Sequence, residues 1–433
     1  MQVHVVNGLG FGDEGKGALV AALSRRIREE TGRAPLVVRF NGGAQAGHNV
    51  TSPAGDRHTF SSFGSGTFEG APTYLSEHFV FHPGAFGVER KRLKALGFEP
   101  RVSISPSARV TTPYHTAANR IRETARGRGR HGSCGVGVGE TARLDAAGWT
   151  LTVWDLRFEE KGELAKRFEF LRDVYYLDDP VFRAEFEAVR ANPSVREEID
   201  LFERPVSEVL EAFRAQAREA LEGASIRLSG DLPEDRALVF EGAQGVLLDE
   251  FRGTFPYCTR SRTTSENALQ ILQSNRVSEV PVRWGIVRSY LTRHGAGPFP
   301  TETDDLADLA EPDNVTGSWQ GAFRRGWLDL PLLRYALAAN FDVDRLAVTH
   351  LDRVEGNWRV ATRYAKGPSL VPGPLGDYEH LRTRITEPLS RAVPVYEGVT
   401  RDSVLRVLSE GLGAPIGGFS TGPAPKDWVF TDD

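Results

Sequence analysis

The sequence predicts an α/β fold with a large, mainly parallel central sheet, helices on both of its faces and an inserted helical subregion. Short apolar runs bounded by turn residues occur at 3–6, 36–38, 237–240, 284–287 and 346–348. Such runs are typical of strands that are buried on both faces of a parallel sheet. The first run is followed by a glycine-rich turn and a helical pattern, an order that is usual at the start of α/β proteins.

The first helix is predicted directly after the turn at 8–17. Its apolar residues Leu19, Val20, Leu23 and Ile27 recur at the spacing that places them on one helical face. A helix with one apolar face is expected to pack against the sheet.

Further helices are expected between two of the predicted strands. Segments 158–189 and 194–221 are rich in Glu, Arg, Ala, Leu and Phe, so we predict a helical insertion at about 158–222. Segments 127–132 and 366–376 have the glycine-rich or proline-rich composition of loops.

Composition and charge exclude several classes of protein. The chain is 40% hydrophobic, and its 53 basic and 58 acidic residues give a formal charge of −5. This balance provides no overall attraction to nucleic acid or anionic lipid, so we expect neither partner. Cys134 and Cys258 are too few for a disulfide framework. No run reaches the roughly 20 apolar residues of a membrane span, and the start lacks the pattern of a signal peptide, so we expect a cytoplasmic protein.

The segment 10–17 reads GFGDEGKG and has the features of a phosphate-binding loop. Its glycines allow backbone N–H groups to turn inward, the following helix offers its positive end, and Lys16 adds charge. Gly17 stands where a P-loop carries the Ser or Thr that binds magnesium. A metal ion would therefore need another ligand, for which Asp13 is a candidate. The alternative is that the turn only connects strand and helix tightly.

A second small-residue loop follows the next predicted strand. Segment 39–49 reads RFNGGAQAGHN, and His48 stands beside its glycines, where α/β proteins gather ligands. This histidine is a candidate donor of a proton or a charged hydrogen bond to a phosphoryl oxygen, although most histidines have no such role. His78 and His82 have a four-residue spacing that indicates a metal site only weakly without a third ligand.

These two loops resemble the adenylosuccinate synthetase family, whose members are GTP-dependent ligases that join aspartate to carbon 6 of IMP. Later segments agree with the family in order and spacing, so the resemblance spans nearly the whole chain and implies one catalytic domain over 1–433. They are FEGAQG at 240–245, LLD at 247–249, GTFPY at 253–257, TRHGAGPFPTE at 292–302, GWLD at 326–329, LD at 351–352 and STGP at 420–423.

The resemblance implies a mechanism in two steps. The 6-oxo group of the purine is phosphorylated by the γ-phosphate of GTP and is then displaced by the aspartate amine. Asp13 matches the family residue that removes the N1 proton, His48 matches the one that stabilises charge on the phosphoryl group, and Lys16 would hold phosphates. Mg²⁺ would be held by Asp13 and the carbonyl of Gly47.

The resemblance also implies binding residues for each reactant. Asp352 would accept hydrogen bonds from N1 and N2 of guanine; the alternative is that it only caps a turn after a strand. The GTP residues are Gly12, Glu14, Gly15, Lys16, Gly17, Gly47, His48, Asp352, Ser420 and Gly422. The purine nucleotide residues are Asp13, Gln45, Ser133, Cys134, Arg143, Gln244 and Thr259, and the aspartate residues are Thr316 and Gly317. A homodimer is also implied, in which a neighbouring chain's arginine reaches the 5′-phosphate; Arg143 lies in the matching region.

Departures from the family pattern concentrate on the substrate side. Gln45 stands where the family has Asn, and Val136 replaces the arginine of the loop GSCGVG at 132–137. Segment 315–326 is longer than its counterpart, and its arginines arrive late. In the family an arginine near this position reaches the ribose hydroxyl, so its loss removes the penalty against deoxyribose.

The changed loops resemble a phage branch of the family that joins aspartate to dGMP for DNA containing 2-aminoadenine. We therefore predict dGMP as the substrate, in the host cytoplasm if the gene belongs to a phage, with IMP as the alternative. Many members of that branch lack the catalytic aspartate, whereas Asp13 is present here. A GTP-hydrolysing switch is a third possibility. The arginines of segment 120–130 lack interleaved aromatic residues, which disfavours nucleic-acid binding.

Overall fold

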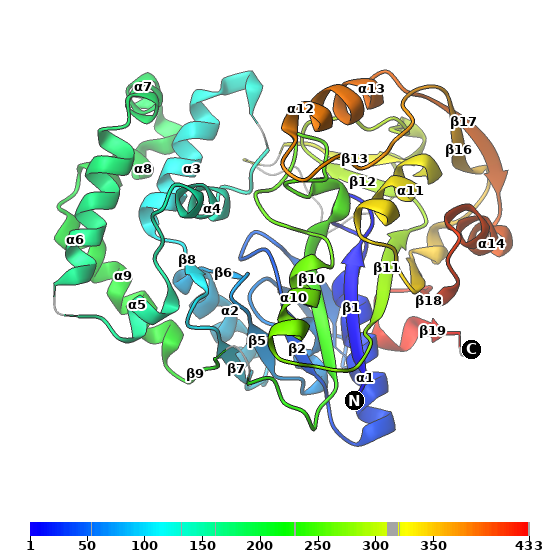
Figure 1. The fold of residues 1–433 in the computed structure, drawn as a ribbon, viewed down its shortest axis with the longest axis horizontal. Coiled ribbons are helices and arrows are strands. Elements are labelled where there is room, and N and C mark those ends of the chain that lie inside the picture. The colour runs from blue at the N-terminus through cyan, green and yellow to red at the C-terminus, as the bar shows by residue number, and fades with distance from the viewer. Residues whose placement is uncertain are drawn as a thin grey trace.

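A ten-stranded sheet crosses the centre of the molecule, and neighbouring strands in it run parallel except for the last pair at one edge (Figure 1). The computed structural model describes residues 1–52, 54–130, 132–160, 162–228, 231–309, 319 and 321–431. In spatial order the strands are β19 (Trp428–Phe430), β18 (Ile416–Ser420), β15 (Arg345–Thr349), β11 (Val282–Arg288), β1 (Val3–Gly8), β10 (Leu238–Gly245), β2 (Leu36–Arg39), β5 (Thr73–Leu75), β7 (Val102–Ile104) and β9 (Ala224–Ile226). The predicted α/β class is confirmed.

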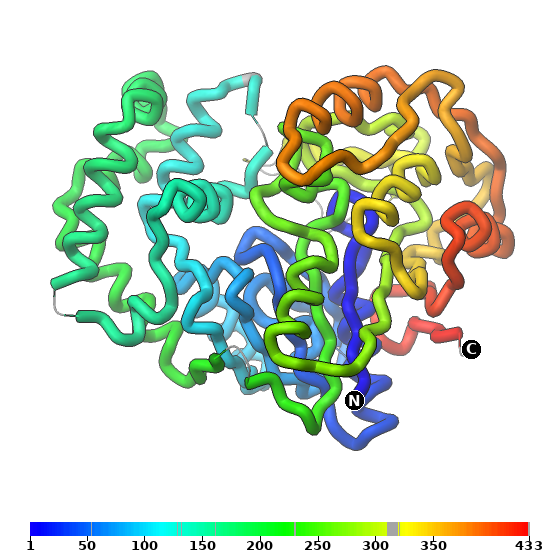
Figure 2. The backbone as a smooth tube through the Cα atoms, in the orientation of Figure 1, coloured from blue at the N-terminus to red at the C-terminus, as the bar shows by residue number. Residues whose placement is uncertain are grey.

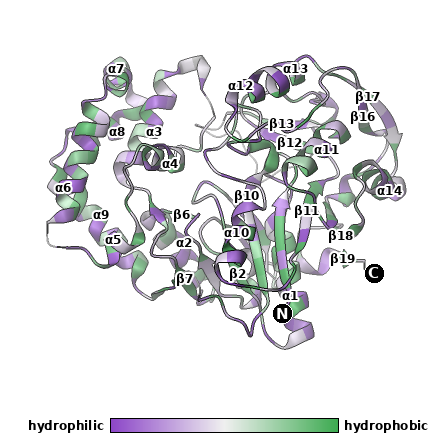
Figure 3. Ribbon diagram, viewed as in Figure 1, coloured by the Kyte–Doolittle hydropathy of each residue, from purple (hydrophilic) through white to green (hydrophobic). Residues whose placement is uncertain are grey.

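All five apolar runs predicted as strands lie in this sheet, as β1, β2, β10, β11 and β15. The sequence analysis did not identify β5, β7 and β9, which have three residues each. Strands of this length are too short to show a periodic pattern. Figure 3 shows the hydrophobic residues concentrated in the central strands.

Helices cover both faces of the sheet. On one face, α1 (Lys16–Thr31) packs its predicted apolar residues against alternate side chains of the central strands, including Val6 and Val239. On the other face, α10 (Glu266–Ser274) packs against Val5 and Phe240. The alternation follows from the two-residue repeat of a strand.

A helical lobe lies on the side of the sheet that ends in β9 (Figures 1 and 2). The insertion predicted at about 158–222 forms part of it, but the lobe begins earlier, because α3 packs against α7 and α8. Its elements are α3 (Pro113–Ala125), α4 (Val138–Ala146), α5 (Val153–Arg157), α6 (Glu163–Phe170), a π-helix (Leu171–Leu177), α7 (Pro180–Val189), α8 (Arg196–Glu203) and α9 (Val206–Leu221). Aromatic side chains such as Phe168, Tyr176 and Phe202 fill its core.

A second group of elements covers the opposite end of the sheet (Figure 1). It contains β12 (Leu291–His294), β13 (Phe323–Gly326), β14 (Leu328–Asp329), α11 (Leu330–Ala339), β16 (Trp358–Lys366), α12 (Tyr378–His380), α13 (Glu387–Leu389), β17 (Val393–Val399) and α14 (Arg401–Leu412). The remaining elements are the hairpin of β3 (His48–Thr51) and β4 (Arg57–Phe60), the pair β6 (Val80–Phe81) and β8 (Arg109–Val110), and α2 (Pro83–Ala95). Among the described helices, none has the length and apolar character needed to cross a membrane.

Candidate active site

Two cavities meet at the edge of the sheet where the parallel strands have their carboxyl ends. The first has a volume of about 480 Å³ and the second about 620 Å³. Strands β1, β10, β11, β15 and β18 all deliver residues to this edge, as is usual for ligand sites of open α/β sheets. Five residues line both cavities, and they are Gly12, Asp13, Gly47, His48 and Asn49.

The glycine loop after β1 is stabilised by its own charged side chains. The Gly12 N–H donates to Glu14 Oε1 at 2.7 Å, and Lys16 Nζ donates to Glu14 Oε2 at 2.8 Å and also to the Gly12 carbonyl. Glu14 therefore lies within the loop and is absent from the described residues that line the first cavity, in contrast to the other residues predicted for GTP. A loop whose N–H group already donates to a carboxylate has the geometry to hold anions.

Two residues that the sequence analysis missed fix this loop from neighbouring strands. The Arg288 Nε at the end of β11 donates to the carbonyl of Asp13. The Thr349 hydroxyl at the end of β15 donates to the carbonyl of Glu14 at 2.8 Å. Because these contacts join residues far apart in the chain, no local motif indicates them.

Gly17 is required by its surroundings. A Cβ atom at this position would lie 2.8 Å from the Cβ of His48 and 2.9 Å from the hydroxyl of Ser65. The start of α1 therefore packs directly against His48, which leaves no room for the Ser or Thr of a P-loop.

Asp13 lies at the junction of the two cavities with its carboxylate paired to a histidine. Its Oδ2 is 3.2 Å from Nε2 of His294, at the end of β12. Burial opposes ionisation, but the hydrogen bond from His294 and the charges of Arg288 and Lys16 outweigh it and lower the pKa of Asp13. The carboxylate is therefore ionised at neutral pH and can accept a proton.

His48 also lines both cavities and is held by a buried carboxylate. Its Nδ1 is 2.5 Å from Oε1 of Glu241, which is fully buried and also accepts the Ser65 N–H at 2.9 Å. Burial lowers the pKa of His48, Glu241 opposes this, and the charges of Arg39 and Lys16 lower it further. The other ring nitrogen, Nε2, is buried without a hydrogen-bond partner among the described residues. It is therefore available to a ligand.

All seven residues predicted for the purine nucleotide line the second cavity. The amide of Gln45 is buried there and has no hydrogen-bond partner in the part of the chain that the structure describes. Because buried polar groups are normally hydrogen-bonded, this amide is a candidate for contact with a ligand. Gln244 has a backbone φ of 62°, which is rare for a residue other than glycine and is common at functional sites. Cys134 donates from its thiol to the Gln45 carbonyl at 3.7 Å, which agrees with a packed thiol.

Burial raises the pKa of Cys258, which also lines the second cavity, to about 12, so this residue stays a neutral thiol. Ser133 exchanges hydrogen bonds with Asn119 at the same wall.

Arginines of the helical lobe reach the second cavity already paired with carboxylates. Arg143 lines the cavity of its own chain and donates to Glu140 at 2.9 Å. Arg122 is 2.6 Å from Glu185, and Arg126 pairs with Glu123. Arg120, which belongs to the arginine-rich segment 120–130, pairs with Glu198 at 2.8 Å. These arginines are therefore engaged inside the lobe.

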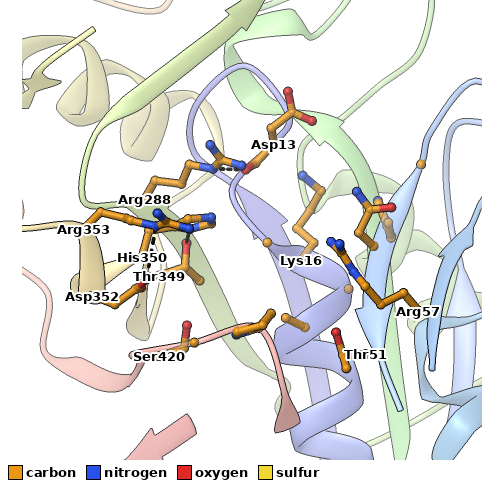
Figure 4. Close-up of a pocket in the computed structure, with 18 of the residues that line it drawn as sticks. Asp13, Lys16, Thr51, Arg57, Arg288, Thr349, His350, Asp352, Arg353 and Ser420 are labelled. Carbon is orange, nitrogen blue, oxygen red and sulfur yellow. Dashed lines mark hydrogen bonds and ion pairs between the residues drawn. The ribbon is translucent and has the colours of Figure 1, made fainter. Parts of the chain in front are cut away.

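The far end of the first cavity is formed by residues after β15 and β18. Asp352, Ser420 and Gly422 all line it, as predicted, together with His350 and Arg353. Figure 4 shows Asp352, His350 and Arg353 gathered across the cavity from Lys16 and Arg57. The cavity thus has the glycine loop at one end and the polar side chain of Asp352 at the other.

The donor atoms at the junction fit a magnesium ion. The carboxylate of Asp13 and the carbonyl of Gly47 are oxygen ligands of the kind that Mg²⁺ takes, and both residues line both cavities. No group of three or more His, Cys, Asp or Glu side chains suited to a metal occurs among the described residues, so the pair at His78 and His82 gains no support. The His82 ring instead accepts the Ala85 N–H at the start of α2. Thr316 and Gly317, predicted for aspartate, lie outside the described residues.

Comparison with known sequences agrees with this geometry. The profile of the family described as adenylosuccinate synthetase matches residues 5–401. The adenylosuccinate synthetase of Thioalkalivibrio sulfidiphilus is 32% identical, covering 97% of this chain and 96% of that protein. That of Halothermothrix orenii is 33% identical, covering 91% of this chain and 86% of that protein.

Solved structures share the fold. The fully ligated adenylosuccinate synthetase of Plasmodium falciparum superimposes with a TM-score of 0.75 at 22% identity, covering the whole of both chains. The succinoaminodeoxyadenylate synthetase of cyanophage S-2L, bound to dGMP and to dATP as an energy donor, gives a TM-score of 0.59 at 17% identity, covering 100% of this chain and 96% of that one.

Proposed function

Because the chain belongs to the adenylosuccinate synthetase family of GTP-dependent C–N ligases, we propose that it joins L-aspartate to C6 of dGMP. The products are 2-amino-2′-deoxyadenylosuccinate, GDP and phosphate. The first cavity takes GTP, and the second takes the purine monophosphate and aspartate. Asp13 and His48, which line both cavities, act on the phosphoryl group as it passes between them.

The proposal of a deoxynucleotide rests on the position of Arg324 and Arg325, which lie near the end of segment 315–326. Arg324 donates to the carbonyls of Gly295 and Gly297 at 3.1 and 2.9 Å, and Arg325 donates to the Leu309 carbonyl at 3.1 Å. Neither is among the described residues that line the second cavity. Because both guanidinium groups are engaged elsewhere, neither donates to a ribose 2′-hydroxyl. A deoxyribose, which lacks this hydroxyl, therefore leaves neither arginine unpaired and loses no binding free energy.

Trp319 belongs to the same segment and supports the same choice. A Cβ atom at Gly135 would lie 2.9 Å from the Trp319 ring, so the ring packs on the loop that follows Ser133. The Arg120 guanidinium lies 5.7 Å from the centre of the ring. Trp319 therefore fills space beside loop 132–137 but does not supply the hydrogen bond to ribose that an arginine would.

In the proposed reaction each residue at the junction acts on a stated atom. The Asp13 carboxylate takes the proton from N1 of the purine, so that O6 attacks the γ-phosphate. In its protonated form, for which Glu241 supplies the counter-charge, His48 donates through Nε2 to the phosphoryl group, and Lys16 and the loop amides hold the phosphates. Mg²⁺ held by Asp13 and Gly47 would neutralise charge on the donor phosphates. The aspartate amine then displaces phosphate from C6.

The test is a comparison of dGMP, GMP, dIMP and IMP with purified protein, Mg²⁺, GTP and aspartate. We expect kcat/KM for dGMP to equal or exceed that for GMP, which isolates the 2′-hydroxyl, and we expect dIMP and IMP to be poorer. Turnover of IMP alone would overturn the ribose argument and favour purine synthesis. GTP hydrolysis that needs neither aspartate nor a monophosphate would identify a GTPase switch instead.

We also propose that the protein forms a homodimer, on the basis of the family resemblance. Arg143 lies against the cavity of its own chain, so a trans role would require it to leave Glu140. Sedimentation of the purified protein with and without dGMP tests the assembly.

A further inference from the structure

An acidic and a basic side chain lie together at the far end of the first cavity. Asp352 and Arg353 follow β15, and Asp352 Oδ2 is 3.1 Å from Arg353 Nε. Both line the cavity, and their side chains are 37% and 38% exposed, so their polar atoms are open to a ligand. Figure 4 shows the pair across the cavity from Lys16. A triphosphate held at the glycine loop would direct its base toward this pair.

We propose that Arg353 acts with Asp352 to select guanine in the phosphoryl donor. The Arg353 guanidinium donates to O6 of the base, while the Asp352 carboxylate accepts from N1–H and N2–H. This inference rests on the proposal that the donor nucleotide occupies the first cavity. It adds a second specificity residue to the carboxylate that the sequence resemblance indicates.

The two protein groups match two adjacent positions on the edge of guanine. O6, an acceptor, is bonded to the carbon next to N1, which carries a donor hydrogen, and the neighbouring guanidinium and carboxylate present the complementary order. Adenine reverses the order, because its amino group would face the guanidinium and its N1 lone pair would face the carboxylate. Both contacts with adenine would therefore be unfavourable, so the pair discriminates in two places.

Arg353 is distinguished from the other arginines near this end. The arginines among the described residues that line the first cavity are Arg57, Arg288 and Arg353. Arg57 lies on β4 beside the glycine loop, and Arg288 is held at the Asp13 carbonyl. Arg401 donates to the backbone carbonyl of Asp352 at 3.2 Å but does not line the cavity, which makes it a matched control.

The experiment compares the wild-type protein with Arg353→Ala and Arg401→Ala, using GTP, ITP and ATP as donors. A specific contact of arginine to guanine is worth roughly 10- to 100-fold. We expect Arg353→Ala to lower kcat/KM by that factor for GTP, mainly through KM. The loss should be equal for ITP, which keeps O6, and absent for ATP. Calorimetric affinities for GDP and ADP should change in the same way, and Arg401→Ala should match the wild type with every donor.

The outcomes separate this inference from the assignment on which it rests. Equal losses for GTP and ATP in Arg353→Ala would show a structural role and overturn the inference, as would unchanged kinetics with GTP. Equal affinity of the wild-type protein for GDP and ADP would also overturn it, because the pair would then not select guanine. If instead Lys16→Ala leaves GDP affinity unchanged, the assignment of the donor to the first cavity fails.

Discussion

Replacing Glu241 by Gln should slow the reaction although residue 241 is separated from both cavities by His48. Glu241 is fully buried, and its Oε1 lies 2.5 Å from Nδ1 of His48. Burial alone would raise its pKa, but Arg39, His48 and Ser65 bring the pKa of Glu241 to about 2, so it is ionised at neutral pH. The carboxylate fixes the orientation of the ring and, in the proposed reaction, stabilises a positive charge on it when Nε2 donates to the phosphoryl group.

The expected magnitude follows from these contacts. Gln keeps the shape and one acceptor oxygen but replaces a charge-assisted hydrogen bond by a neutral one, which is about half as strong. A hydrogen bond to a charged group is worth about 1.5–3 kcal/mol, so the substitution removes about 0.8–1.5 kcal/mol of transition-state stabilisation. This corresponds to a fall in kcat of roughly 4- to 12-fold.

The assay is the initial rate of product formation at saturating substrates, with two control variants. Ser65→Ala removes a donor to Glu241 but leaves the charge beside His48, so its kcat should change less. Glu241→Gln also leaves the buried Arg39 without its counter-ion, which destabilises the fold, so Arg39→Met with Glu241→Gln restores neutrality. If folded Glu241→Gln protein has the wild-type kcat, or if the double variant recovers it, the positioning of His48 by the carboxylate is refuted.

Three further predictions concern the loop and the core. Asp13→Asn should lower kcat by roughly 10²- to 10⁴-fold at saturating Mg²⁺, because an amide cannot take the N1 proton; an unchanged rate would exclude Asp13 as the base. Gly17→Ser should lower kcat without improving Mg²⁺ affinity, because its Cβ would displace His48; Mg²⁺ titration of the rate distinguishes a new ligand from a displaced histidine. Burial raises the pKa of Asp329 to about 6, although hydrogen bonds from Tyr364 and Leu332 lower it. The contribution of Asp329 to the free energy of unfolding is therefore favourable below about pH 4 and is lost as the pH rises through 6. Between pH 4 and 8 the urea-unfolding free energy of wild type should therefore fall by about 3 kcal/mol relative to Asp329→Asn, and parallel curves would contradict this.

The fold could be predicted where the sequence pattern is local. The strands β1, β2, β10, β11 and β15 contain runs of apolar residues, because parallel strands buried on both faces hold mostly apolar side chains. The pattern gives less information at the sheet edges. Strand β18 reads IGGFS, and its two glycines resemble a turn more than a strand. Its pairing with β15 is a tertiary effect that overrides local propensity.

The candidate site shows the same division. Glycine loops and the residues within them are visible in the sequence because phosphate binding needs glycine at fixed positions. Glu241 and His294 were not predicted as functional residues, although both lie in segments that carry the family resemblance. Each acts through a partner far along the chain, His48 and Asp13 respectively, and only the folded sheet brings these pairs together.

Substitutions at the junction of the two cavities should affect the reaction differently from substitutions at the far end of one cavity. Residues at one end of one cavity, such as Arg353, contact only one reactant, so their loss should change the KM of that reactant. Asp13 and His48 line both cavities, where we propose that phosphoryl transfer takes place, so their loss should lower kcat with either purine substrate. The specificity of the enzyme for the sugar and the base of its substrate can then change through segments such as 315–326, while the reaction catalysed at the junction stays the same. That separation explains how Asp13 can persist in a chain whose substrate loops depart from the family pattern.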